Sequence, residues 1–250
     1  MKRHLERIEW SPSPRRPPDT TSWPFTIPAV AQIIRDGGLD VPEGVTFLVG
    51  ENGSGKSTLI EAFAAIYPRR GHETSVGANV VGPQPSIEDS PLHFHLHART
   101  HKLASPAGFF LRAESMHEFL DDEDRGASKK AWGNERLQAR SHGESFLTVL
   151  RHRFEDVGVY FLDEPESALS FQSCLGLVSL LATMQREGSQ IIVATHSPLL
   201  VSLPGATLLE IGEDGIRRVA TYDDLALVKS WRHFLSAPGQ FLRHLVDSTS

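Results

Sequence analysis

The sequence predicts an α/β fold organised around a parallel β-sheet. Three strand-length segments, residues 45–49, 157–162 and 191–194, are almost wholly apolar. Runs of this kind are expected in parallel strands, because helices cover both faces of such a sheet. Residues 56–67 and 171–187 carry apolar side chains at helical spacing and separate the predicted strands. This alternation of strands and helices favours the α/β class.

The other elements follow from local signals. Residues 25–34 fit either a strand or a short helix, and residues 108–111 fit a short apolar strand. Residues 207–211 and 216–220 predict a β-hairpin, and residues 223–246 predict a helical tail. The side chains expected to point inward from the longest predicted helix are Cys174, Leu175, Val178, Leu181 and Ala182.

Composition limits the class of protein. With 250 residues, 40% of them hydrophobic, the chain can bury a substantial core. Its single cysteine, Cys174, excludes an intrachain disulfide and a thiolate metal cluster, which favours a reducing compartment such as the cytoplasm. No segment approaches the roughly 20 apolar residues of a membrane helix, and the N-terminus lacks the apolar core of a signal peptide. We therefore expect a soluble, cytoplasmic chain without direct membrane insertion.

Residues 1–24 are expected to form a solvated, Pro-rich basic arm. The whole chain has a formal net charge of −6, which argues against the broad basic field that nucleic-acid binding commonly uses. A local basic patch in this arm is the exception. Its members are Lys2, Arg3, Arg7, Arg15 and Arg16.

Residues 50–58, Gly-Glu-Asn-Gly-Ser-Gly-Lys-Ser-Thr, match the phosphate-binding pattern G-x-x-x-x-G-K-[ST]. The segment leaves a predicted strand and opens a predicted helix, which is the context that this pattern requires. Backbone N–H groups can surround phosphates here, while Lys56 can reach the β- and γ-phosphates and Ser57 can ligate magnesium. The residues expected to bind the nucleotide are Gly50, Asn52, Gly53, Ser54, Gly55, Lys56, Ser57 and Thr58.

Two adjacent carboxylates, Asp163 and Glu164, follow the second apolar strand. Taken alone, they also fit a helix-capping turn. Beside a phosphate loop, Asp163 can hold magnesium and Glu164 can act as the general base for the attacking water. His196 follows the third strand, so we expect it at the same edge of the sheet, although a lone histidine there is commonly structural. We assign catalytic roles to Glu164, His196 and Lys56.

In order and spacing, these motifs resemble the ATP-binding-cassette (ABC) ATPases. The resemblance implies a P-loop NTPase fold with an ABC-like core sheet, a small antiparallel β part and a helical subdomain. It implies ATP and Mg²⁺ as ligands, and a homodimer that closes head to tail around two ATPs. The implied domains are an arm over 1–24, an ATPase domain over 25–221 with its helical subdomain at about 113–155, and a C-terminal helical tail over 222–250.

Residues 141–145, Ser-His-Gly-Glu-Ser, lie where that family has its signature loop, and residues 167–170 lie where it has its D-loop. The family's Leu-Ser-Gly-Gly-Gln is altered here, because His142 replaces a glycine and glutamate replaces the glutamine. By the resemblance, the residues that bind the ATP of a second copy of the chain are Ser141, Gly143 and Glu144.

Two further family positions lack a clear counterpart. No Q-loop glutamine follows residues 108–111, where Arg112 or Glu114 falls instead. The aromatic residue that stacks on adenine is expected upstream of the glycine loop, where Trp23 and Phe25 are the candidates, with plain core packing as the alternative.

The motifs resemble the soluble chromosome-maintenance, recombination-repair and defence members of the family more than its transporter subunits, because Asp-Glu-Pro-Glu and Ala-Thr-His-Ser-Pro occur here. Three functions remain open. The chain can be a hydrolysing ATPase, an ATP-gated dimerising module on a DNA or protein partner with negligible hydrolysis, or the ATPase subunit of a transporter.

Four histidines stand outside this scheme: His93, His95, His97 and His101. Their period-two spacing predicts that the first three share one face of a strand, a geometry open to zinc or nickel. A solvated strand face without a metal is the alternative.

Overall fold

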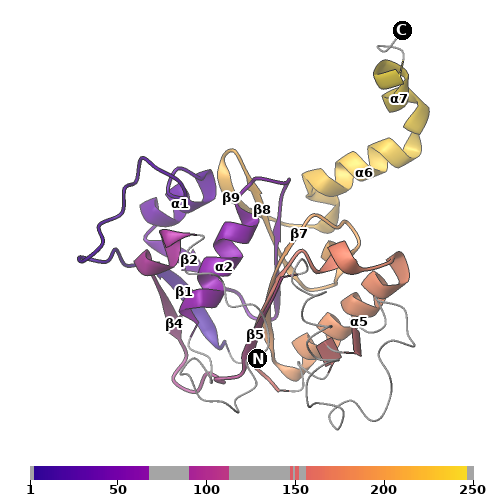
Figure 1. The fold of residues 1–250 in the computed structure, drawn as a ribbon. Coiled ribbons are helices and arrows are strands. Elements are labelled where there is room, and N and C mark those ends of the chain that lie inside the picture. The colour runs from indigo at the N-terminus through magenta and orange to yellow at the C-terminus, as the bar shows by residue number, and fades with distance from the viewer. Residues whose placement is uncertain (1–2, 68–89, 113–146, 149, 152–155, 247–250) are drawn as a thin grey trace, which may run out of the picture.

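The computed structural model describes residues 3–67, 90–112, 147–148, 150–151 and 156–246, and the structural statements below concern these residues. They form a six-stranded and a three-stranded β-sheet, with helices on both faces of the larger sheet (Figure 1). The predicted α/β class is confirmed. Most of the predicted helical subdomain, about 113–155, lies outside the described residues.

The larger sheet contains the apolar segments of the sequence. Its spatial order is β5 (Gly108–Arg112), β6 (Val159–Asp163), β7 (Gln190–Thr195), β3 (Val45–Val49), β8 (Thr207–Gly212) and β9 (Gly215–Val219). The first five strands are parallel, and the hairpin partner β9 is antiparallel. Every residue of β3, β6 and β7 is buried. The carboxyl ends of these three strands therefore meet at one edge of the sheet.

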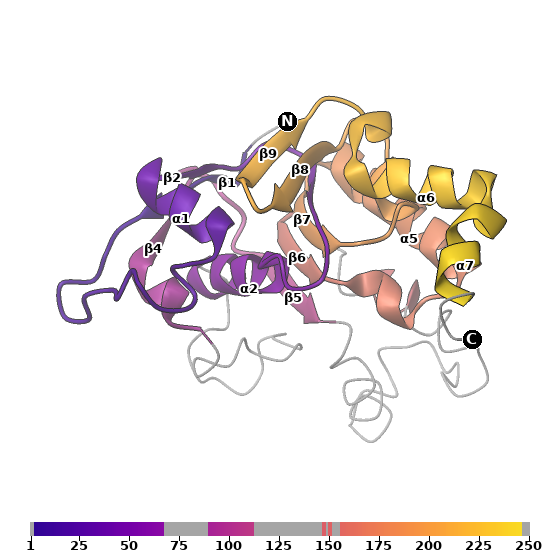
Figure 2. The ribbon, with the colours of Figure 1, turned by 90° about the horizontal axis from the view of Figure 1, so that it is seen from above.

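Helices bury each face of this sheet. The helices α1 (Pro28–Arg35) and α2 (Lys56–Ile66) cover one face, and α5 (Phe171–Glu187) covers the other (Figures 1 and 2). Neighbouring strand residues alternate between the two layers, so that Phe161 packs on the α2 side and Tyr160 on the α5 side. These two buried layers fix the strand ends that carry the predicted site.

The predicted inward face of α5 is correct in part. Both ends of the helix are capped, because the Ser170 side chain accepts from Ser173 N and Gly188 adopts a φ of 100°. Leu175, however, is 43% exposed, and Leu177 and Met184 are buried. The prediction that Leu175 points inward is therefore wrong, because the helix is rotated so that Leu177 and Met184 face the core instead.

The prediction of a solvated arm is wrong for Leu5–Trp10. These residues form β1, the centre of the three-stranded antiparallel sheet β2 (Gly38–Asp40)–β1–β4 (Leu96–Thr100). The buried side chain of Gln190 joins β1 to the main sheet, since its Oε1 accepts from Leu5 N at 2.8 Å and its Nε2 donates to Leu5 O at 2.8 Å. These two hydrogen bonds satisfy the backbone N–H and C=O groups of Leu5, which burial would otherwise leave without partners.

The predicted histidine face does not form. His93 and His95 lie in a short 3₁₀ helix, Pro91–His95, and only His97 lies on β4. His95 is buried, packs on Trp10 and accepts a hydrogen bond from Ser13 N at 3.2 Å, so it is a core histidine. Within the described residues, no cluster of His, Cys, Asp and Glu could hold a metal.

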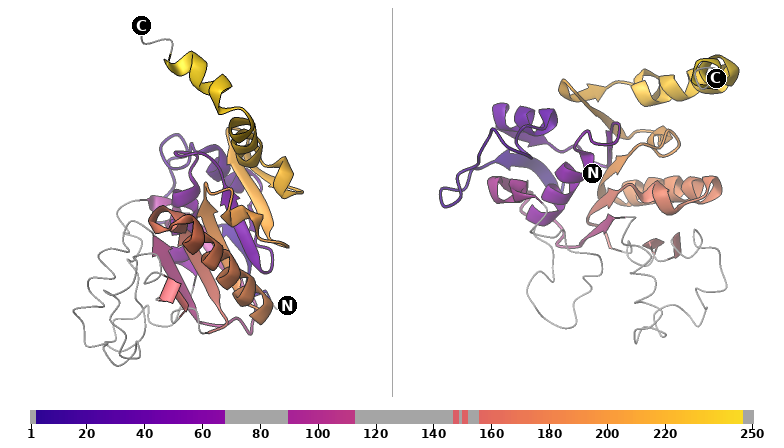
Figure 3. Two further views of the ribbon diagram at one scale, coloured as in Figure 1. Left: turned by 90° about the vertical axis from the view of Figure 1, so that its right-hand side faces the viewer. Right: turned by 45° about the horizontal axis from the view of Figure 1, so that its top comes forward.

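The predicted helical tail is present as α6 (Ala226–Ser236) and α7 (Pro238–Val246). Figure 3 shows these helices leading away from the sheets. Short 3₁₀ helices also occur at Pro165–Ala168, Leu200–Ser202 and Tyr222–Asp224. None of the helices described is long and apolar enough to cross a membrane.

Candidate nucleotide site

The glycine loop connects β3 to α2 and requires glycine at several positions. Gly53 and Gly55 have φ values of 80° and 95°, in the left-handed region that side chains disfavour. A Cβ on Gly55 would lie 2.6 Å from Ile27 Cγ2, and one on Gly50 would lie 2.4 Å from Ile211 O. The pattern of glycines is thus dictated by both backbone conformation and close packing.

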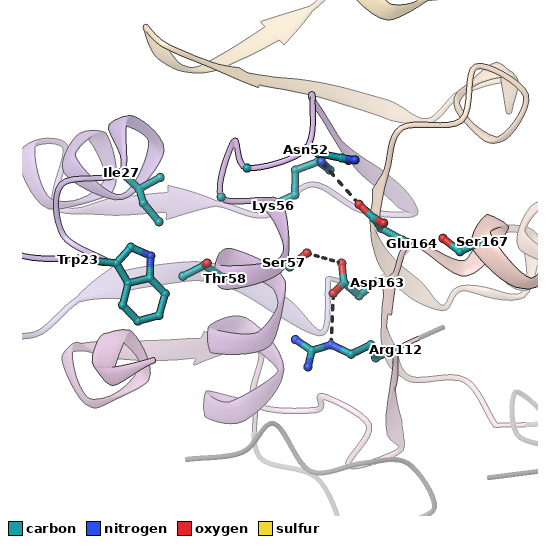
Figure 4. Close-up of a pocket in the computed structure, with 12 residues that line it drawn as sticks. Trp23, Ile27, Asn52, Lys56, Ser57, Thr58, Arg112, Asp163, Glu164 and Ser167 are labelled. Carbon is teal, nitrogen blue, oxygen red and sulfur yellow. Dashed lines mark hydrogen bonds and ion pairs between the residues drawn. The ribbon is translucent and has the colours of Figure 1, made fainter. Parts of the chain in front are cut away.

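The parallel sheet brings Lys56, Ser57, Asp163 and Glu164 together, as Figure 4 shows, whereas Gly50 and His196 line a second cavity. Ser57 Oγ donates a hydrogen bond to Asp163 Oδ1 at 3.1 Å. Lys56 Nζ donates to Glu51 O at 2.9 Å and lies 3.8 Å from Glu164 Oε1. Lys56, Ser57, Asp163 and Glu164 line a cavity of about 560 Å³. The other residues lining it are Trp23, Ile27, Asn52, Gly53, Gly55, Thr58, Arg112 and Ser167.

The cavity places charges where water is largely excluded. Asp163 is only 4% exposed, and this burial raises the pKa of its carboxyl to about 6, against the opposing effects of the Ser57 hydrogen bond and the Arg112 charge. Burial also lowers the pKa of Lys56, while the nearby carboxylates of Glu164 and Asp163 act in the opposite direction. Desolvation therefore disfavours the charged forms of Asp163 and Lys56. A bound ligand of opposite charge would offset this free-energy cost.

Ionised Asp163 should therefore destabilise the protein without nucleotide. Its pKa in the fold, about 6, lies above the value of 3.8 for the free side chain, so its contribution to stability is present below pH 3.8 and is lost as the pH rises through about 6. We expect Asp163→Asn to raise the free energy of unfolding by about 1–3 kcal/mol at pH 8, and by less at pH 5. Urea unfolding at both pH values measures this.

Asp223→Asn, at an exposed position of the short helix before α6, is the matched control. It should change the stability little at either pH, because an exposed carboxylate keeps its hydration. A loss of stability in Asp163→Asn at pH 8 would show that the contacts of the carboxylate with Ser57 and Arg112 outweigh its burial.

Glu164 has an unusual backbone conformation for a residue with a side chain. Its φ and ψ are both 47°, in the left-handed region, immediately after β6 ends. Such a conformation costs of order 1 kcal/mol or more and is often found at functional sites. It directs a carboxylate with 30% exposure into the cavity, where Oε1 lies 3.5 Å from His196 Nδ1. Glu164, Lys56 and His196 are thus brought together as predicted.

Glu166 is a component of the site that the sequence did not reveal. Its Oε1 accepts hydrogen bonds from Thr195 Oγ1 at 2.5 Å and from His196 N at 2.9 Å, and it lies 3.6 Å from His196 Nδ1. The carboxylate therefore fixes the turn after β7 that carries His196. The signal was the fourth residue of Asp-Glu-Pro-Glu, but only the folded chain shows its partner.

The structure distinguishes between Trp23 and Phe25, the two candidates for the residue that stacks on adenine. Trp23 lines the cavity and is 55% exposed, whereas Phe25 is 4% exposed and packs edge-on against Trp10 and His95. Phe25 is therefore a core residue. Trp23 lies in the cavity beside Thr58 and Ile27 (Figure 4), where its ring can meet a ligand.

Three predicted site residues lie outside the described residues: Ser141, Gly143 and Glu144. Glu114, one of the two residues at the Q-loop position, lies outside them as well. The other, Arg112, lines the cavity beside Asp163.

The oxygen atoms of this site suit magnesium. Ser57 and Asp163 offer a hydroxyl and a carboxylate oxygen 3.1 Å apart, and Mg²⁺ characteristically takes one or two such protein ligands and completes its shell with phosphates and water. The buried Ser54 Oγ makes no hydrogen bond within the described residues, but it lies close to Gly50 and does not line the cavity. Ser57 and Asp163 thus fit magnesium, and Lys56, which lines the cavity, fits a phosphate.

Comparisons with known proteins agree with this geometry. A family model described as "AAA domain, putative AbiEii toxin, Type IV TA system" matches residues 137–202, and one described as "AAA domain" matches residues 29–67. The first range contains Asp163, Glu164 and His196, and the second contains the glycine loop.

Sequence relatives include ATP-binding proteins of export and import systems. The cytochrome c biogenesis ATP-binding export protein CcmA of Rhodospirillum rubrum is 28% identical, over 68% of this chain and 75% of its own length. The zinc import ATP-binding protein ZnuC of Halorhodospira halophila is 31% identical, over 68% of this chain and 64% of its own length. The match to the ribose import ATP-binding protein RbsA of Roseobacter denitrificans, at 28% identity, covers only 34% of that protein.

Solved structures share the fold. A protein described as a metal-chelate type ABC transporter in an inward-facing conformation has a TM-score of 0.53 at 15% identity, covering 90% of this chain and 86% of that one. The fold and the matched segments define the class: this chain contains a P-loop ATPase domain of the ABC type. The family resemblance of the motifs is thereby confirmed, while the preference for its chromosome-maintenance and defence branch stays a prediction.

Proposed function

We propose that the chain is a Mg²⁺-dependent ATPase that binds ATP at the glycine loop, dimerises around two ATPs and opens on hydrolysis. The observation that carries the proposal is the convergence of Lys56 and Ser57, at the start of α2, with Asp163 and Glu164, at the end of β6, on one cavity. A chance glycine turn would not place a lysine, a hydroxyl and two carboxylates there. The relatives named for ATP binding support the same ligand.

Each residue then has a distinct role. Lys56 binds the β- and γ-phosphates, and the backbone N–H groups at the start of α2 add the partial positive charge of a helix N-terminus. Ser57 and Asp163 hold magnesium, which neutralises charge that develops on the phosphates. Glu164 accepts the proton of the attacking water, and His196, positioned by Glu166, lies beside that base.

The dimer follows from the family resemblance. Residues 141–145 would complete the nucleotide site of a second copy, so that ATP holds the two chains together. We further propose that the ATPase domain extends back to β1, because that strand packs through Gln190 onto the main sheet. The tail over 222–250 and the helical subdomain at about 113–155 complete the proposed organisation, in a cytoplasmic protein.

Calorimetry with Mg-ATP and a steady-state phosphate-release assay test this function directly. We expect saturable binding together with measurable turnover. Binding without turnover would favour the ATP-gated module, and an absence of heat on adding Mg-ATP would refute the nucleotide site itself.

Trp23 is the proposed adenine-stacking residue. Because stacking of a base on an aromatic ring contributes about 1–3 kcal/mol, we expect Trp23→Ala to weaken Mg-ATP binding by about 5- to 100-fold. Binding of Mg-tripolyphosphate, which lacks the base, should not change. Trp231→Ala removes a similarly exposed tryptophan from α6 and serves as the control. Equal weakening of ATP and tripolyphosphate binding would exclude stacking.

A transporter subunit is the second candidate, and a specific observation favours it. The sequence relatives described above act in export and import systems, and their matches reach 75% of one such protein. Against it, Ser-Pro after His196 resembles the soluble members of the family, and the family model that matches residues 137–202 is not described as a transporter. Co-purification of the intact chain with an integral membrane partner would support the transporter assignment.

A further inference from the structure

Arg112 is one of the two residues, with Glu114, that fall where the resemblance places a neutral glutamine. It is the last residue of β5 and lies directly beside Asp163 in the parallel pairing of β5 with β6. Its Nε lies 3.7 Å from Asp163 Oδ2, while Asp163 Oδ1 accepts from Ser57. Figure 4 shows Asp163 between Ser57 and Arg112. The guanidinium thus adjoins the magnesium ligand on the side away from Ser57.

Glu61 holds this guanidinium in place. It lies four residues after Ser57 on α2, hence on the same face of the helix, and forms an ion pair with Arg112. The Glu61 side chain is 11% exposed, whereas that of Arg112 is 30% exposed and lines the cavity. Glu61 therefore holds Arg112 from the α2 side, and the guanidinium remains accessible to a ligand in the cavity.

Arginine cannot replace glutamine chemically at this position. A guanidinium carries only N–H donors and keeps its charge at any physiological pH, so it cannot ligate a metal ion but binds phosphate oxygens well. Lys56 and Arg112 together give the cavity two cationic side chains. A neighbouring permanent cation attracts a polyphosphate and repels Mg²⁺.

We propose that Arg112 is a second phosphate-binding residue of this cavity, and that its charge makes nucleotide binding less dependent on magnesium. The proposal rests on the nucleotide site of the proposed function. Glu61 limits the effect of the Arg112 charge on a bound phosphate, because its carboxylate partly neutralises the guanidinium from the α2 side.

The test compares the Kd of a fluorescent ATP analogue in EDTA with that in excess Mg²⁺. In Arg112→Gln, affinity in EDTA should fall at least tenfold, and the ratio of the two Kd values should rise at least fivefold. Arg112→Lys keeps the charge and should keep the ratio within about threefold of wild type. Glu61→Gln should act in the opposite direction, with tighter binding in EDTA and a smaller ratio.

Arg99→Gln, which breaks ion pairs with Glu6 and Glu9 on the small sheet, should change neither Kd. The proposal fails if Arg112→Gln leaves the ratio unchanged or lowers it, or if Glu61→Gln weakens binding in EDTA as Arg112→Gln does, since a purely structural clamp predicts the latter. If wild type binds the analogue and Arg112→Gln binds identically, only the Arg112 assignment falls. If wild type does not bind at all, the proposed function falls with it.

Discussion

Lys56→Ala should abolish nucleotide binding at concentrations where wild type is saturated, with affinity lowered by about 100-fold or more. The lysine is 3% exposed, and its ammonium is held by Glu51 O and Glu164 at the start of α2, whereas the other cationic side chain lining the cavity, Arg112, lies beside Asp163. Hydrogen bonds to charged groups contribute about 1.5–3 kcal/mol each, and several form to a polyphosphate. Calorimetry with Mg-ATP measures the loss.

The same substitution should not unfold the protein. Burial disfavours the charged form of Lys56, and relief of this desolvation cost should largely offset the lost attraction to Glu164 and Asp163, so the melting temperature should change little. Lys229→Ala, at an exposed site on α6, is the control and should bind ATP as wild type does. If Lys56→Ala still binds ATP tightly, the glycine loop is not the phosphate site.

Glu164→Gln should retain ATP but lower the turnover number by about 10²- to 10⁴-fold, the range for loss of a general base. The amide keeps the shape of the side chain and can still accept a hydrogen bond from Lys56. With hydrolysis blocked, ATP should hold the closed dimer. Gel filtration with light scattering, with and without Mg-ATP, should show a shift from the 27.6 kDa monomer to twice that mass.

Glu187→Gln, on the exposed last turn of α5, should neither slow turnover nor trap a dimer. Turnover at the wild-type rate in Glu164→Gln would overturn the assignment of the base. A variant that is slow yet monomeric with bound ATP would keep the base and reject the dimer. The two parts of the proposed function are thus tested separately.

The sequence predicted the centre of the fold because local and tertiary requirements agree there. Strands β3, β6 and β7 are buried on both faces, so their apolar runs identify them without knowledge of their neighbours. β1 was missed for the opposite reason. Its burial does not alternate, since the register with β4 shifts between Leu5 and Arg7, and both Leu5 and Ile8 are buried. Charged residues between them conceal a strand that only its partners reveal.

The site was predictable only where residues belong to a short motif. The glycine loop and the Asp163–Glu164 pair are contiguous in sequence, so their chemistry can be recognised from spacing. The ion pair of Glu61 with Arg112 and the bonds from Thr195 and His196 to Glu166 depend on which strands are neighbours. Such contacts join residues about 30 to 50 positions apart and follow from strand order, which no local pattern specifies.

The amide of Gln190 has a practical consequence for anyone who shortens this chain. A fragment that began at residue 25, ahead of the glycine loop, would keep every phosphate-binding group yet lose the strand on which that buried amide depends. Its oxygen would then lose both of its partners, His4 N and Leu5 N, and face a void or invading water, while its nitrogen would keep the hydrogen bond to Pro42 O at 2.7 Å. Residues 4–10 are therefore part of the folded unit that carries the candidate nucleotide site, and shortening the chain past them should loosen the start of β7.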